Sequence, residues 1–147
     1  MAGLKLRVAD EQDLAVVSAI LQDSLVTVRE MAYLPEENRF VLVANRFRWE
    51  PDEGGTRANF ERILTGFCID DVRTVQRRGF DPREPHQILS LLAIRVEPAE
   101  TGAALLLDFA GGSSIRLDVG AFACRLDDLG EPWPTQWRPQ HPVDDAD

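Results

Sequence analysis

The sequence is poor in the residue types that most often carry catalysis and metal binding. It has two histidines, and neither His86, in a proline-flanked loop, nor His141, near the C-terminus, has a suitable partner close by in the sequence. It has two cysteines, and no C-x-x-C, H-E-x-x-H, G-x-S-x-G or P-loop spacing. We therefore expect no metal centre, no cofactor and no histidine-based catalysis.

Long apolar runs and an export signal are also missing. No stretch approaches the roughly 18 uninterrupted apolar residues of a membrane span. Met1 to Val8 lacks the apolar segment that a secretory signal needs. These absences predict a cytoplasmic protein that does not associate with membranes. In such a reducing compartment we expect Cys68 and Cys124 to be free thiols.

Basic charge is scarce and unevenly placed. Lys5 is the only lysine, and 16 basic residues face 25 acidic ones, which gives a net charge of −9. By thirds, residues 1–38 carry −4, residues 39–95 carry +2 and residues 96–147 carry −7. Because a field of this sign repels polyanions, we expect neither nucleic acid nor an anionic membrane as a partner. Only the middle third favours a local anion site.

The length of 147 residues predicts a single domain, 1–147. A short edge strand is expected at Leu4–Val8. Asp10 then makes a suitable N-cap for an amphipathic helix over Glu11–Asp23. The apolar residues that recur at helical spacing in this segment are Leu14, Val17, Ile20 and Leu21.

The middle of the chain has the alternation and turn residues of antiparallel strands. A turn at Pro35-Glu36-Glu37-Asn38 joins two strands of a central hairpin within Val26–Glu50, and Asn38 is expected in the left-handed region. Gly111-Gly112 predicts a second, tight hairpin. The strands expected after the first turn are Arg39–Trp49, Phe60–Ile69, Val72–Arg78 (after a turn at Asp70-Asp71), Gln87–Val96, Leu105–Phe109 and Ile115–Val119.

After the last hairpin the spacing of Phe122, Leu126 and Leu129 predicts a short C-terminal helix that Gly130 caps. The proline-rich segment 131–147 is expected to be an extended tail, attached by Trp133 and Trp137 and frayed over 142–147. The predicted fold is α+β: about seven mainly antiparallel strands, as a bent sheet or a split barrel. The element order suggests an analogy with pleckstrin-homology folds.

Four sequence strings carry a resemblance to a known family: D-L-A-V-V-S-A-I-L-Q-D-S-L, M-A-Y-L-P-E-E-N-R-F-V-L-V-A-N-R-F-R-W-E, T-G-F-C-I-D-D-V and R-L-D-D-L-G-E-P-W-P-T. Over nearly its full length the chain resembles the bacterial family called domain of unknown function 2948. The resemblance implies an uncharacterised bacterial protein in a cytosolic housekeeping setting. It implies no activity, cofactor, partner or site residue.

The sequence suggests one candidate binding site and two candidate contact groups. Four arginines on strands that could be neighbours predict a forked site for a carboxylate or phosphate: Arg46, Arg48, Arg73 and Arg77. The alternative is that they pair with nearby carboxylates on a wet sheet face. Cys68, expected opposite Arg73, is a candidate reactive thiol or a buried filler. Trp133 and Trp137 are candidates for contact with a partner.

Two functions remain open from the residues. We favour a non-enzymatic binding or interaction module, with a protein partner or a homodimer formed through an open sheet edge or the tryptophan-bearing tail. The alternative is an enzyme or carrier that holds a small anionic metabolite against the arginines. Two turns carry adjacent carboxylates, Glu36-Glu37 and Asp70-Asp71. Adjacent turn residues point apart, so we interpret them as solvated turn residues and not as a catalytic pair.

Overall fold

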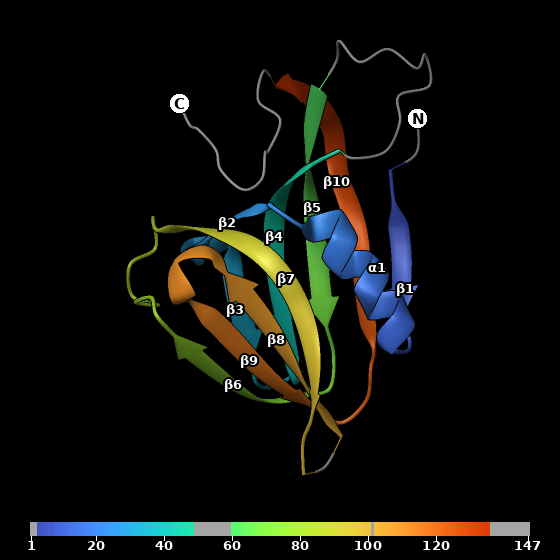
Figure 1. Cartoon of the computed structure of the whole chain (residues 1–147), viewed down its shortest axis with the longest axis vertical. Helices are drawn as coiled ribbons and strands as arrows, with labels where there is room; N and C mark the ends of the chain where they lie inside the picture. Colours follow the sequence, from blue (N-terminus) through green and yellow to red (C-terminus); the bar gives the residue numbers. More distant parts are fainter. Residues whose placement is uncertain (1–2, 49–59, 101, 136–147) are drawn as a thin grey trace.

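The computed structural model describes residues 3–48, 60–100 and 102–135. These residues form ten β-strands, one α-helix and two short 3₁₀-helices (Figure 1). In chain order the elements are β1 (Lys5–Val8), α1 (Glu11–Leu21), β2 (Leu25–Thr27), η1 (Val28–Glu30), β3 (Met31–Leu34), β4 (Arg39–Phe47), β5 (Phe60–Ile69), β6 (Val72–Arg78), β7 (Ile88–Pro98), β8 (Ala103–Phe109), η2 (Ala110–Gly112), β9 (Ser114–Val119) and β10 (Cys124–Thr135).

The strands make one bent antiparallel sheet. Its order is β1-β10-β5-β4-β2-β7-β8-β9-β6, and β3 pairs beside this path with the first residues of β4. In Figure 1 the β7-β8-β9-β6 region lies in front of the strands around β4 and β5. Buried side chains from both regions, such as Leu42, Phe67, Leu107 and Leu117, belong to a single apolar core. Helix α1 packs chiefly on β7 and also contacts β1 and β4.

The two turns that sequence chemistry predicted are confirmed. Asn38 has a φ of 52° where the chain returns from β3 to β4, and Gly111 and Gly112 have φ values of 84° and 85° between β8 and β9. Asparagine and glycine adopt this left-handed region at low cost. The β8–β9 pairing, from Ala103 opposite Val119 to Asp108 opposite Ser114, follows from the second turn.

The predicted α+β class is wrong, and so is the analogy with pleckstrin-homology folds. The described residues hold ten strands and not about seven, and β10 occupies the segment expected to be a C-terminal helix. Cys124, Leu126 and Asp128 point inward in alternation, and β10 pairs with β1 and β5. The alternation of a strand with two neighbouring strands therefore prevailed over the helical spacing. As a result Leu129, which the helical spacing grouped with Leu126, lies on the exposed face of β10.

The N-terminal helix also differs from its prediction. Asp10 caps it, since its carboxylate accepts a hydrogen bond from the Asp13 N–H at 2.8 Å. The helix ends at Leu21, and Asp23 takes a positive φ. It is not the amphipathic helix that was expected, because its exposed side carries Ala15, Val16 and Ala19. Apolar residues thus lie on both faces.

The hairpin expected from β5 into β6 is not formed. β5 pairs with β4 and β10, whereas β6 pairs with β9 at the far end of the sheet order. The turn at Asp70-Asp71, where Asp71 has a φ of 58°, sends the chain from one region of the sheet to the other. Cys68 consequently lies between Val41 and Arg125, and not opposite Arg73.

The proposed tail begins as part of β10. The pairing with β5 is interrupted between Leu129 and Trp133 and then resumes to Thr135. Pro132 and Pro134 lie at and after this irregularity, which is where a strand tolerates residues without an N–H. Segment 131–147 is therefore strand up to Thr135. Trp137, His141 and the expected fraying over 142–147 lie outside the described residues.

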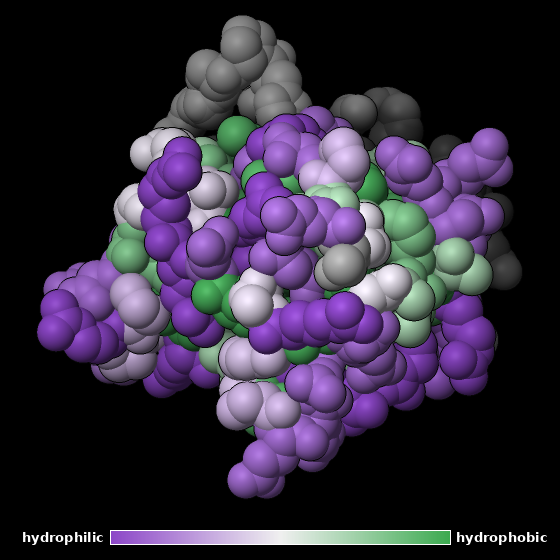
Figure 2. All heavy atoms as spheres, turned by 90° about the horizontal axis from the view of Figure 1, so that it is seen from below, coloured by the Kyte–Doolittle hydropathy of each residue, from purple (hydrophilic) through white to green (hydrophobic). Residues whose placement is uncertain are grey.

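The surface at one end of the molecule is polar. Figure 2 shows the end that is lowest in Figure 1, where hydrophilic residues cover most of the coloured surface and hydrophobic residues appear as small separate patches. Large contiguous apolar patches commonly mark hydrophobic contact sites. This face shows none among its coloured residues, so polar side chains are the candidates for contacts there.

Candidate functional site

The four arginines predicted to form one anion site lie in separate surroundings. Arg46 lies on β4 and Arg48 follows its end, whereas Arg73 and Arg77 lie on β6, and β4 and β6 are not neighbours in the sheet. Arg48 pairs with Glu61 on β5. Arg73 lies 3.8 Å from the carboxylate of Asp71. The expected convergence of these side chains is therefore absent.

Arg46 lies inside the protein. Its side chain is 1% exposed, and it forms an ion pair at 2.8 Å with Asp128 of β10, whose side chain is 4% exposed. The Arg46 Nε also donates to Thr65 Oγ1 at 3.0 Å, and the Thr65 hydroxyl donates to Asp128 at 2.6 Å. The backbone N–H of Leu4 donates to the same carboxylate at 2.9 Å. This network joins β4, β5, β10 and the start of the chain.

The hydrogen bonds of this network decide the charge state of Asp128. Burial by itself raises the pKa of a carboxyl group, because it disfavours the ionised form. The hydrogen bonds from Arg46, Thr65 and Leu4 and the charge of Arg46 outweigh burial, and they hold the pKa of Asp128 below its ordinary value. Asp128 is therefore a carboxylate that balances a buried guanidinium, which is a structural role.

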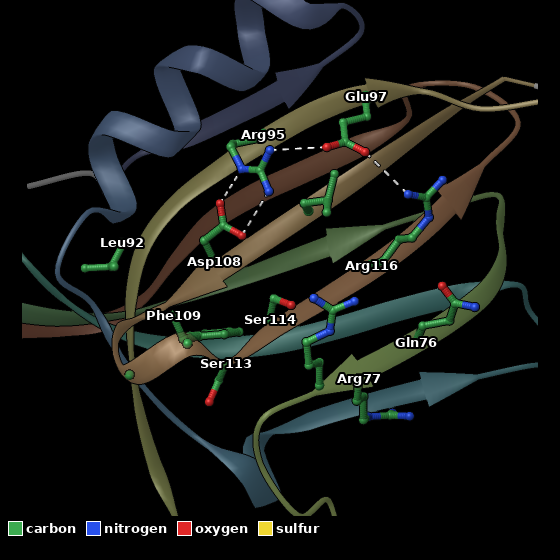
Figure 3. A pocket seen from close by; sticks show the side chains of 14 residues that line it. Gln76, Arg77, Leu92, Arg95, Glu97, Asp108, Phe109, Ser113, Ser114 and Arg116 are labelled. Carbon is green, nitrogen blue, oxygen red and sulfur yellow. Dashed lines mark hydrogen bonds and ion pairs between the residues drawn. The ribbon is translucent and has the colours of Figure 1, made fainter.

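A hollow of about 850 Å³ lies on the outer face of the β7-β8-β9-β6 region (Figure 3). Strand register places its central residues in one row across the four strands: Arg95 opposite Leu106, Leu106 opposite Arg116, and Arg116 opposite Gln76. The neighbouring row toward the glycine turn ends with Ser114 opposite Arg78. Directly opposite side chains share a face of the sheet, so these residues line a common surface.

Two of the arginines in the hollow are fixed by carboxylates. Arg95 forms a two-point ion pair with Asp108 and lies 3.3 Å from Glu97. Glu97 also reaches Arg116 at 3.4 Å, and Arg116 pairs with Asp118 at 3.2 Å. Figure 3 shows this chain of contacts running from Asp108 through Arg95 and Glu97 to Arg116. The hydrogen bond with Asp108, followed by its charge, raises the pKa of Arg95.

Arg77 and Arg78 differ from that pair. Both line the hollow and both are exposed, and no carboxylate of the described residues lies within ion-pair distance of either. Arg78 lies on the outer face, opposite Ser114. Arg77 is opposite the buried Ile115 and so belongs to the other face, at the rim. Its guanidinium points away from Arg116 and Glu97 in Figure 3.

Some of the residues that line this hollow could be recognised in the sequence. Asp108, Ser114 and Arg116 alternate with apolar residues in the two strands of the second hairpin, which is the pattern of strands with one solvent-exposed face. Arg78 and Arg95 were not singled out, because their place beside that hairpin depends on strand pairs that the sequence left open. Of the four predicted arginines, Arg77 is the one that lines the hollow.

Comparison with known proteins identifies the family. The model of the family described as "Protein of unknown function (DUF2948)" matches residues 4–141 of the chain. The chain belongs to this family. No curated protein and no solved structure matches it. The resemblance seen in the sequence strings is thus confirmed.

The remaining candidate residues of this DUF2948 protein are spread over the fold. Cys68 and Cys124 are both free. Burial raises the pKa of the Cys124 thiol to about 12. Cys68 is half-buried and lies 3.4 Å from the Arg125 guanidinium, whereas Arg73 was the expected neighbour. Trp133 is 37% exposed on β10.

In the part of the DUF2948 chain that the structure describes, no three histidine, cysteine, aspartate or glutamate side chains are grouped as a metal ion would require. No helix in this part of the chain is long and apolar enough to cross a membrane.

Proposed function

We propose that the protein is a non-enzymatic, cytoplasmic binding module of bacteria, and that the hollow on β7-β8-β9-β6 holds an anionic group of its partner. The observation that carries this proposal is the contrast within the hollow. Arg95 and Arg116 are engaged by carboxylates, whereas Arg77 and Arg78 have no such partner in the described part of the chain. Arg78 is the anchor, with Ser114 and Gln76 beside it.

The charge of the lining supports an anion. Four arginines and two carboxylates line the hollow, which leaves a local charge of +2 in a protein of net charge −9. A concave surface concentrates such a field. A guanidinium also presents its donors in a planar fork that fits a carboxylate or a phosphate.

The state of the two carboxylates favours binding over acid–base catalysis. A general base or acid must be able to exchange a proton with a substrate. Glu97 and Asp108 instead accept hydrogen bonds from arginines of the same face. They position Arg95 and Arg116, and they are therefore parts of a fixed polar surface.

The test compares Arg78→Ala with Arg83→Ala, a matched loss of one exposed arginine outside the hollow. Thermal unfolding is followed with phosphate, citrate and a glutamate-rich peptide, each against chloride at equal ionic strength. We expect stabilisation of the parent and of Arg83→Ala, rising to about 2.7 kcal/mol at a hundredfold excess over the dissociation constant. Arg78→Ala should lose most of it.

The three probes separate the sources of the anion. Stabilisation by phosphate or citrate alone would indicate a small metabolite, which is the alternative function. Stabilisation by the peptide would indicate an acidic macromolecule. A parent protein that responds to none of them beyond chloride would rule out the proposed function.

A further inference from the structure

Among the described residues, β6 is the last strand in the sheet order and pairs on one side only. Its only strand partner among the described residues is β9. All of its residues from Arg73 to Arg78 are exposed except the half-buried Val75. In Figure 1 it is the outermost strand of its region. An edge strand of this kind presents unpaired N–H and C=O groups to a further strand.

The beginning of this edge is already capped. The Val72 N–H donates to the carbonyl of Asn38 at 2.8 Å. The Tyr33 hydroxyl lies 3.0 Å from the carbonyl of Val72 and 3.3 Å from that of Arg73, and so caps this end of the strand. The β3–β4 hairpin thus closes the first two residues of β6. A further strand has Thr74–Arg78 available.

The charge of the edge selects its occupant. β6 carries Arg73, Arg77 and Arg78 and no acidic residue. A second copy of β6 would bring arginines against arginines, an arrangement that protects edges from self-association. An acidic segment would instead meet opposite charge. Addition of an extended peptide to a sheet edge is an established mode of recognition, in which main-chain hydrogen bonds supply affinity and side chains supply specificity.

The register defines which acidic segment fits. Arg77 and Arg78 lie on opposite faces of the sheet, and successive residues of an added strand also point to opposite faces. Two consecutive acidic residues would therefore reach both arginines. The residue opposite Val75 would be apolar. The other strand pairs of the sheet are antiparallel, and an antiparallel peptide would meet Arg78 first and Thr74 last. Its residues would therefore be, in order, acidic, acidic, polar, apolar and polar.

We propose that the partner is an extended peptide segment of this pattern, which adds to β6 along Thr74–Arg78 as an eleventh strand. This inference rests on the proposed function, since Arg78 is common to both. It assigns the partner class as an acidic polypeptide in extended conformation, and it makes the hollow the surface beside which that segment lies.

The experiment measures fluorescence anisotropy of labelled Asp-Glu-Thr-Val-Thr, flanked by serines, with the full chain. Two control peptides are used: one with Asn-Gln in place of Asp-Glu, and one N-methylated at alternate residues so that it cannot form the main-chain ladder. We expect each control peptide to bind at least about tenfold more weakly. Arg77→Ala/Arg78→Ala should show a similar loss, whereas Arg83→Ala should bind as the parent does.

Amide hydrogen exchange gives a second readout, and peptide should slow exchange within Thr74–Arg78. Equal binding of the N-methylated peptide would overturn strand addition while leaving the proposed function intact. Stabilisation by phosphate that depends on Arg78, without any binding of the peptide, would also overturn strand addition and leave the proposed function intact. If the parent protein responds to neither the peptide nor phosphate, both proposals are refuted. A peptide-free dimer that dissociates on adding peptide would assign the edge to a second copy.

Discussion

The two regions of the bent sheet distribute charge in opposite ways. Around β4, β5 and β10 a charged pair, Arg46 and Asp128, lies on the buried face, and apolar side chains such as Leu64 and Leu129 are exposed on the other. Across β7, β8, β9 and β6 the buried face is apolar. There charged residues of the exposed face, such as Arg78, Arg95 and Arg116, line the outer hollow.

This contrast separates structural charge from charge that a ligand can reach. A buried ion pair is tolerated only when its hydrogen bonds are satisfied inside the protein, and Asp128 meets that condition through Arg46, Thr65 and Leu4. Exposed ion pairs contribute little to stability. Arginines of the hollow therefore remain available for recognition at small structural cost.

The largest effect is expected for Asp128→Ala. Removing this carboxylate takes from the buried Arg46 guanidinium its ion pair with Asp128. We expect a loss of about 3–5 kcal/mol in the free energy of unfolding. Denaturant titration with fixed slope provides the measurement.

The control for this variant replaces both partners by apolar residues, as in Arg46→Met/Asp128→Leu. Exchange of a complete buried pair is often close to neutral, so the double variant should be more stable than Asp128→Ala. Equal destabilisation of the two would show that the cost arises from lost packing and not from an unbalanced charge.

A smaller effect is expected on acidification. The folded pKa of Asp128 lies below its unfolded value of about 3.9. A lowered pKa means that its stabilisation is complete above about pH 4 and is lost as the pH falls through the folded pKa. Unfolding measured from pH 5 downward should show this loss in the parent.

Asp81→Asn is the matched control for the acid experiment. The pKa of Asp81 is also lowered, by hydrogen bonds from Arg83, but that pair lies on the exposed surface. Solvent and salt screen such a pair. Asp81→Asn should therefore keep the acid dependence of the parent, and a large change in this variant would contradict the assignment to Asp128.

The smallest effect on stability is expected for Arg78→Ala. Arg78 is exposed and has no carboxylate partner among the described residues, so the free energy of unfolding should change by less than about 0.5 kcal/mol. The same denaturant titration measures it beside Asp128→Ala. A loss comparable to that of Asp128→Ala would remove the distinction between structural and ligand-accessible charge.

Local features of the fold could be predicted because their physical causes are local. The glycines between β8 and β9 and Asn38 before β4 determine turns through their own φ preferences. The pairing of β6 with β9 could not be found in this way. Nothing within Val72–Arg78 distinguishes its true partner from β5, which precedes it directly in the chain.

The candidate site could likewise be predicted only where it depends on local sequence, and not where it depends on strand pairing. Of the four arginines proposed for one anion site, Arg77 lines the hollow, and its neighbours there come from β7, β8 and β9. Arg46 shares the strand face of Phe40, Leu42 and Ala44, and its burial depends on a carboxylate 82 positions away. A charged residue on a buried face becomes interpretable only when its partner is placed.

The position of β10 between β1 and β5 bears on how the protein is made. Within the described residues, β1 has β10 as its only strand partner, with Lys5 opposite Asp127 and Val8 opposite Cys124. β1 therefore cannot pair until β10 has been translated. Contacts of such long sequence separation slow folding, so we expect β1 to join the sheet late in folding.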